Sequence, residues 1–464
     1  MKRVSKFAMT VAMAALSVTV TSPVWAADEK PKKQKKGAKA EAPAALKANL
    51  SKEFKAVYDL VVNVYLKSAG ATKPGIPRDA ASIAATAAAA TIASASWDAL
   101  KAAIRNEDDK YQAGVFGQQI GGEAKNEAMR IEAIDLVIAS TFTPADLRTT
   151  YVFQKAATAY DTKDWVNAET LLIQAHNAGY KSVTIPGGVE MLIADSFNMQ
   201  KKYPQSLEWM QKSLDASKQP GTKALPENFY ARAANVAIRS GNGGLVAKWM
   251  RELVNSNPTA DYWHDALMQT YKFADLDSQE VLDLMRLLRT VGGMKYEQNY
   301  SAYATDALIA FFPTEMKTVM DEGFAKGTIS KTNATFGGRY NDIIEKLKID
   351  GFSLTVLDQD IAVAKTGASS AFAGDIALSV GEYARAKTAY EAALAKGAIV
   401  DKEGKNLSER TIMRLGIAKL KLGDLAGAKG EFAKISAPGR KSVADYWSLY
   451  AEHMEKGIAA PQAK

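Results

Sequence analysis

The stretch from Gly374 to Gly397, GDIALSVGEYARAKTAYEAALAKG, carries the clearest structural pattern in the chain. A period of 3.6 residues places Gly374 and Ala377 on one face of a first helix. Gly381 then interrupts the run, which is typical of a turn between helices. One face of the second helix alternates small and large residues: Ala386, Tyr390 and Ala393. The stretch therefore predicts two short antiparallel helices whose backbones approach where small residues meet, with tyrosines filling the gaps.

The same frame of small and large residues recurs along the chain. Equivalent small positions begin at Ala156, Ala194, Ala234, Gly374 and Gly416. This spacing resembles the tetratricopeptide repeat (TPR), in which helical hairpins stack into an array. The resemblance implies an all-α fold, an α-α superhelix of TPR-like hairpins with an N-terminal helical cap and a C-terminal capping helix.

The resemblance also implies a binding groove lined by the first helix of each hairpin. Carried over position by position, the expected groove residues are Tyr160, Asn198, Asn235, Arg239, Arg410, Met413 and Lys421. Asn235 and Arg239 lie one turn apart and could hold a peptide backbone or a carboxylate. The carboxylate-binding set of Lys and Asn typical of some TPR proteins is not reproduced, which argues against a binder of C-terminal tails.

Frame, composition and charge together divide the chain into seven parts. We expect a signal peptide at 1–26, a disordered Lys/Ala/Pro-rich tail at 27–43, a helical region at 44–148, about five TPR-like hairpins at 149–328, a divergent hairpin at 329–366, two strong TPR units at 367–440, and a capping helix with tail at 441–464.

The first residues have the features of an export signal. Lys2, Arg3 and Lys6 precede a short apolar run, and the run ends in small residues that predict cleavage after Ala26. An uncleaved membrane anchor is the alternative. The chain has no cysteine, which excludes a lipoprotein anchor and disulfide bonds. We therefore expect a periplasmic or secreted protein, with no membrane span after cleavage.

The net charge of +8 does not indicate a nucleic-acid-binding protein. Residues 1–26 contribute +3 and residues 27–42 contribute another +3, so the remaining chain carries only +2. A nucleic-acid-binding domain would need this excess on a folded face.

The region 44–148 predicts helices outside the repeat frame. The Ala-rich run from Ala80 to Ala95 is expected to form a tightly packed helix. Four glycines in the next segment predict a mobile connector: Gly114, Gly117, Gly121 and Gly122.

Motifs for catalysis are absent from the sequence. The three histidines, His176, His264 and His453, share no motif and are expected at the surface or at helix ends. We find no nucleophile elbow and no phosphate-binding loop, and the chain has no thiol. The sequence thus predicts no enzyme activity, no cofactor and no metal site.

The remaining hypotheses concern recognition. The first is a scaffold or adaptor that binds envelope proteins or peptides. The alternative is a module that binds cell wall or polysaccharide in an export or biogenesis machine, which would need exposed, coplanar rings at positions such as Tyr160 and Phe273. The partner, the pathway and the oligomeric state do not follow from the sequence.

Overall fold

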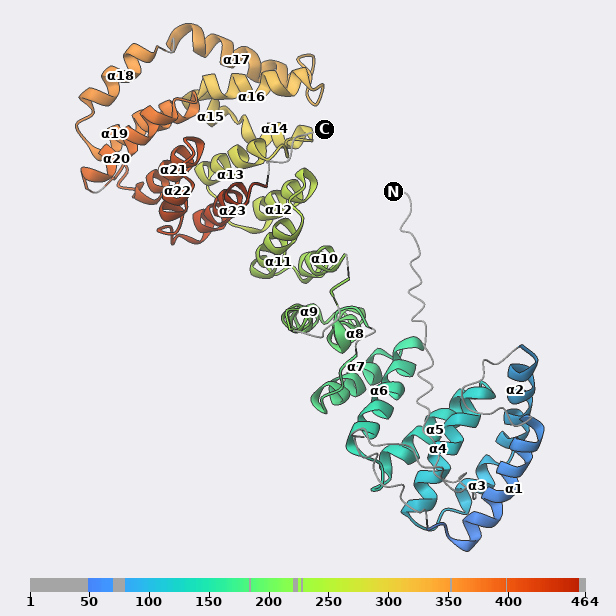
Figure 1. Ribbon diagram of the computed structural model, residues 1–464. Coiled ribbons are helices and arrows are strands. Elements are labelled where there is room, and N and C mark those ends of the chain that lie inside the picture. The colour runs from blue at the N-terminus through green and yellow to red at the C-terminus, as the bar shows by residue number, and fades with distance from the viewer. Residues whose placement is uncertain are drawn as a thin grey trace, which may run out of the picture. The chain divides into compact units, whose positions relative to one another are not determined.

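The computed structural model describes residues 49–69, 80–182, 185–219, 224–226, 228–350, 353–397 and 399–458 (Figure 1). The expected signal peptide and Lys-rich tail lie outside these residues. Apart from one antiparallel bridge between Val400 and Asn406, the described residues form helices and their connections. The all-α class is therefore confirmed. The chain divides into two compact units, residues 1–200 and 201–464.

The described part of unit 1 is built from successive helices. They are α1 (Lys52–Ala69), α2 (Ala80–Ser94), α3 (Trp97–Ala102), α4 (Glu107–Glu123), α5 (Glu127–Ala139), α6 (Ala145–Asp161), α7 (Trp165–Asn177) and α8 (Gly188–Met199). From α4 onward each helix packs against the next, and α1 packs against α2 and α3. Ala156, Ala168 and Leu172 are buried between α6 and α7, as the repeat frame predicts. The boundary expected at residue 148 falls inside α6.

The prediction of a mobile connector at the four glycines is wrong. All four lie inside α4, and three of them are buried against neighbouring helices. A Cβ atom on Gly114 would stand 2.5 Å from the Val137 side chain, and one on Gly117 would stand 2.4 Å from the Trp97 ring. These glycines let α4 approach α5 and α3 closely, so their role is packing.

The described residues of unit 2 also form helices and connecting loops. The helices are α9 (Tyr203–Ser217), α10 (Phe229–Ser240), α11 (Gly243–Ser256), α12 (Ala260–Phe273), α13 (Ser278–Thr290), α14 (Glu297–Tyr303), α15 (Asp306–Phe311), α16 (Pro313–Ala325), α17 (Ala334–Asp350), α18 (Leu354–Val363), α19 (Gly367–Ser379), α20 (Tyr383–Ala395), α21 (Ser408–Lys421), α22 (Leu425–Phe432) and α23 (Pro438–Glu455).

The two strong repeats have the geometry that their residues predict. Helices α19 and α20 form the first hairpin, and α21 and α22 form the second. A Cβ on Gly374 would stand 2.7 Å from the Tyr390 ring, and a Cβ on Gly416 would stand 2.5 Å from the Phe432 ring. Gly381 turns the chain with a φ of +83°, a value that favours glycine. In each hairpin, the aromatic ring on the second helix therefore packs against the glycine on the first helix.

The last part of the range 149–328, where about five hairpins are expected, contains three helices, α14, α15 and α16. Ala304 ends the first, and Pro313 begins the third. Ala307, on α15, is exposed. Proline cannot continue a helix from the residues before it, which separates α15 from α16, while the break between α14 and α15 falls where the Thr305 side chain caps the start of α15.

The range 329–366, where a divergent hairpin is expected, contains α17 and α18, which pack mainly against other helices. Helix α17 packs against α15 and α16, and α18 packs against α19. Figure 1 shows the two helices following one another along the outer edge of unit 2. They link the hairpins on either side.

The last helix does not cap an open stack. Helix α23 packs against α21 and α22, and also against α11 and α13, more than a hundred residues earlier in the chain. Figure 1 shows α23 beside α12 and α13, where it closes unit 2 on itself. His453 lies in the last turn of α23, one of the two kinds of position expected for it, but it is only 2% exposed and its ring stands edge-on to Trp263. Unit 2 is a closed array of helices.

The packing of α20 leads to a direct prediction. Ala386 is fully buried on α20, so replacing it with leucine should lower the free energy of unfolding by about 1–3 kcal/mol. Lys387→Leu, one residue along on the more exposed side, should change it by less than about 0.5 kcal/mol. Urea unfolding of both variants measures the difference. Equal losses would contradict this assignment of helix faces.

Candidate functional site

The most concentrated set of charges in the described residues lies at the centre of unit 2. Asp283 on α13 accepts a hydrogen bond from Arg286 Nη1 at 3.0 Å and from Arg414 Nε at 3.1 Å. The Arg440 guanidinium, on α23, lies 3.5 Å away. All four side chains are buried. One carboxylate thus joins three helices that are distant in sequence.

The network continues on one side to α16. Arg286 donates two hydrogen bonds to Glu315, from Nε at 2.8 Å and from Nη2 at 2.7 Å. The Tyr303 hydroxyl donates to the same carboxylate at 2.9 Å. Burial, with the Glu315 charge adding to it, holds the pKa of Tyr303 well above its ordinary value. The hydrogen bonds from Arg286 and Tyr303 compensate for burying the Glu315 charge inside the protein.

On the other side the network reaches α19 and α20. Asp375 lies 2.8 Å from Arg414 Nη1 and 3.4 Å from Arg410 Nη2, and it accepts a hydrogen bond from the Tyr390 hydroxyl at 2.8 Å. Burial alone would raise the pKa of Asp375, but the charges of Arg414 and Arg410 outweigh it and lower that pKa. Asp375 therefore stays ionised and holds the two arginines.

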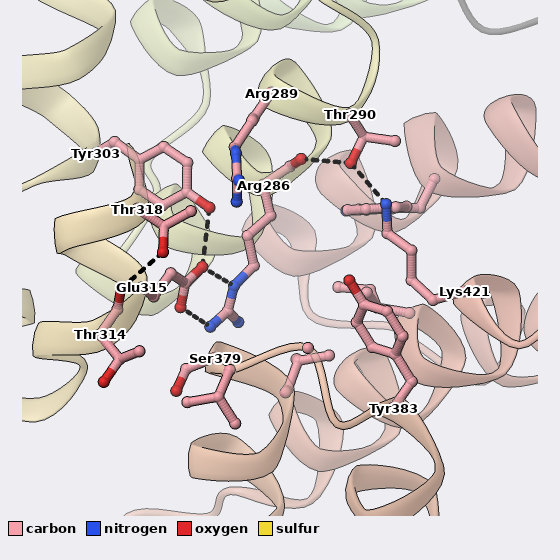
Figure 2. Close-up of a pocket in the computed structure, with 15 residues that line it drawn as sticks. Arg286, Arg289, Thr290, Tyr303, Thr314, Glu315, Thr318, Ser379, Tyr383 and Lys421 are labelled. Carbon is pink, nitrogen blue, oxygen red and sulfur yellow. Dashed lines mark hydrogen bonds and ion pairs between the residues drawn. The ribbon is translucent and has the colours of Figure 1, made fainter. Parts of the chain in front are cut away.

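A cavity of about 360 Å³ lies beside this network. Its lining comes from α13, α14, α16, α19, α20, α21 and α23 and from the turn after α19. Figure 2 shows Lys421 and Tyr383 on one side and Glu315 and Tyr303 on the other. Three cationic side chains line it: Arg286, Arg289 and Lys421. The cavity therefore combines positive charge with hydroxyl groups.

Two of these cations have carboxylate partners. Arg286 is held by Glu315, and Arg289 Nε donates to Glu322 at 2.9 Å. Lys421 differs, because its Nζ donates to the neutral Thr290 hydroxyl at 3.0 Å. Thr290 in turn donates to the carbonyl oxygen of Arg286 at 2.8 Å.

Burial, and then the nearby Arg289 charge, lowers the pKa of Lys421 from 10.5 to about 8. Between these two values the unfolded chain binds the proton more strongly than the folded one. The contribution of Lys421 to stability therefore rises as pH increases from about 8 to 10.5.

The structure separates the predicted groove residues. Arg410 and Lys421 are both on α21 in unit 2, where Arg410 belongs to the buried network and Lys421 lines the cavity. Met413, also on α21, is 0% exposed, so it is a core residue and cannot line a groove.

Asn235 and Arg239 are exposed on α10 of unit 2. Tyr160 and Asn198 are in unit 1 and are half-buried. The Tyr160 hydroxyl donates to Asp195 at 3.2 Å, and the Oδ1 atom of Asn198 is buried without a hydrogen bond.

Sequence reasoning missed Asp283, Glu315, Asp375 and Arg414. A signal was present on α13, where Asp283 and Arg286 stand one turn apart inside the apolar run VLDLMRLL. Charged residues inside such a run are expected to be paired when buried. Arg414, the partner of Asp283 on α21, also lies inside an apolar run, IMRLGIA, but the sequence does not say which charged residues meet.

Among the described residues, no group of three or more His, Asp or Glu side chains could hold a metal ion. None of the helices that the structure describes is both long and apolar enough to cross a bilayer.

Comparison with known proteins gives structural neighbours only. No known family model matches the chain, and no characterised protein sequence matches it. Among solved structures, the chain is similar to the TPR2AB domain of yeast Sti1 in complex with pHSP90, with 11% identity over 67% of this chain and 96% of that one and a TM-score of 0.23. It is similar to a TPR protein from Parabacteroides merdae, with 13% identity over 66% and 98% and a TM-score of 0.22. The TPR domain of P58(IPK) is 12% identical over 87% and 98%, with a TM-score of 0.19.

The TPR-like character of this chain rests on its own hairpins. In each strong repeat the first helix carries a glycine that contacts an aromatic ring of the second, Gly374 with Tyr390 and Gly416 with Phe432. The protein is therefore an all-α array of TPR-like helical hairpins.

Proposed function

We propose that this protein is a non-enzymatic scaffold or adaptor of the bacterial cell envelope that binds segments of partner proteins. The observation that carries the proposal is the exposed pair Asn235 and Arg239 on α10, the first helix of a hairpin with α11. Ala234 and Ala237 on the same helix are buried, so the hairpin core holds the pair in place.

The chemistry of this pair suits an extended acidic segment. Neither side chain has a hydrogen bond or an ion-pair partner among the described residues. An asparagine amide can both donate to and accept from a peptide backbone, and an arginine fork binds a carboxylate. Held one turn apart, the two groups match a backbone amide beside an acidic side chain. This part of the proposal extends a common property of helical arrays.

The polysaccharide alternative is less well supported. The Tyr160 ring stands edge-on to Trp165, with ring centroids 5.3 Å apart and planes at 87°. The Lys272 ammonium lies 5.3 Å from the Phe273 ring centroid. Each ring already has a neighbouring side chain against it, so we favour protein segments as the ligands.

Export to the envelope remains part of the proposal and rests on residues 1–26. The intact mass of the protein recovered from the periplasmic fraction tests it. A chain that begins at Ala27 is expected, and a chain that keeps Met1 in the membrane fraction would favour the uncleaved anchor.

Capture from an envelope extract tests the binding role. The tagged full-length chain should retain a defined set of proteins, and Asn235→Ala with Arg239→Ala should reduce their recovery at least about tenfold, because charge-assisted hydrogen bonds are lost. Lys248→Ala, at an exposed position on α11, is the matched control and should leave recovery unchanged. Capture of insoluble wall material without protein, or equal recovery by both variants, would contradict the proposal.

A further inference from the structure

Lys421 lines the cavity beside the buried network and, among the described residues, has no carboxylate partner. Arg286 and Arg289 are each bound to a carboxylate, Glu315 and Glu322. Within the part of the chain that the structure describes, no carboxylate lies within ion-pair distance of Lys421 Nζ, whose partner is the Thr290 hydroxyl. A half-buried ammonium with a single neutral partner is costly for the folded protein.

The other residues that line the cavity indicate which kind of ligand body it could hold. Apolar side chains border the cavity from three helices and a turn: Leu378, Val380, Ile417 and Trp447. Tyr383 adds a ring and a hydroxyl on the same side as Lys421 (Figure 2). The volume of about 360 Å³ lies at the lower end of the range of small-molecule sites, roughly 300–1,000 Å³.

The charges of the lining residues decide which anion the cavity can hold. One unpaired ammonium matches one negative charge, because the two arginines already have carboxylate partners. A phosphate dianion would bring a second negative charge close to Glu315 in a half-enclosed space, where charges interact strongly. A carboxylate has one charge and accepts several hydrogen bonds in one plane.

We propose that this cavity binds a small monocarboxylate with an apolar body, whose carboxylate accepts from Lys421 while its body contacts Val380 and the Tyr383 ring, which are half-buried. The site is separate from the α10 pair, so it adds a small-molecule ligand to a protein-binding scaffold. The lowered pKa of Lys421 agrees with a buried ammonium that has a positive charge nearby and would be stabilised by a bound anion.

Binding of benzoate to the full-length chain tests this proposal, with benzamide as its neutral analogue and inorganic phosphate as the competing anion. Calorimetry at constant ionic strength should show that benzoate binds and that the other two do not. Lys421→Met should weaken benzoate binding at least tenfold. Lys218→Met, at an exposed lysine on the C-terminal end of α9, is the matched control and should leave it unchanged.

Chemical labelling of the unmodified chain gives a second readout that does not depend on a variant folding. Acetylation of Lys421 by acetic anhydride should be slowed in the presence of benzoate, while acetylation of Lys218 should not. The proposal is overturned if benzoate neither binds nor protects Lys421, if folded Lys421→Met binds benzoate as well as the wild type, or if phosphate binds more tightly than benzoate.

Discussion

Replacing Asp283 with leucine is expected to destabilise unit 2 by about 3–5 kcal/mol, because the change leaves buried arginines without their shared carboxylate. Asp283 is 0% exposed and accepts from Arg286 and Arg414, which are themselves buried. Removing one member of a buried ionic network costs more than the network contributes as a whole, since the remaining charges stay away from water. Urea unfolding of the full chain measures the loss.

A matched control and a double variant sharpen this result. Asp215→Leu removes an exposed carboxylate on α9 that pairs with Lys218, and it should change stability by less than about 0.5 kcal/mol. Adding Arg414→Met to Asp283→Leu should add to the loss, because Arg414 also pairs with Asp375 at 2.8 Å and its removal leaves that buried carboxylate with Arg410 alone. Equal effects of Asp283→Leu and Asp215→Leu would show that Asp283 does not hold the network together.

Replacing Trp447 with alanine is expected to cost about 3–5 kcal/mol and to open the contact between α23 and α13. Trp447 is 0% exposed, and its Nε1 donates to the Asp283 carbonyl oxygen at 3.0 Å. The ring also stands edge-on to Tyr450, with centroids 6.3 Å apart. Removing it leaves a void where the last helix closes unit 2, and the neighbours can fill it only in part.

Hydrogen exchange locates this effect. Backbone amides of α23 and α13 should lose protection in Trp447→Ala, because the two helices pack against each other. Met454→Ala, at an exposed position on the same helix, is the control and should leave both helices protected. Loss of protection confined to α23 would mean that this helix is a terminal cap after all.

Much of the secondary structure could be predicted from the sequence because its causes are local. The alternation of glycine, alanine and tyrosine from Gly374 to Ala393 requires two helices that pack closely, and α19 and α20 have this geometry. The Ala-rich run after Ala80 also forms the expected helix, α2. The spacing of apolar residues indicates which face of a helix is buried, whichever helix packs against that face.

The glycines of α4 show where local reasoning fails. Four glycines within nine residues favour a flexible segment by propensity alone. In the fold, Trp97 and Val137 occupy the space that Cβ atoms at Gly117 and Gly114 would need, so tertiary contacts keep the segment helical. A glycine can therefore lie in a turn, as Gly381 does, or inside a helix that packs closely against another. The residues that contact it in the fold decide which.

The candidate site was even less accessible to sequence reasoning. Lys421 was expected on a groove and instead lines a cavity, and Met413 was expected beside it and is in the core. Helix α21 has α20, α22 and α23 around it, so both of its faces are covered, and the simple division into a packed face and a groove face fails.

The sequence by itself determined the helical hairpins of this protein, since residue size at a fixed spacing selects both the helix and its close partner. Only the tertiary structure decided that α23 returns to α13, that Asp283 meets Arg414 across 131 positions of the chain, and that Lys421 lines a cavity where, among the described residues, its partner is a hydroxyl group and not a carboxylate. The physical reason is that burial of charge depends on which surfaces meet, and contacts between distant segments leave no periodic pattern in the residues that make them.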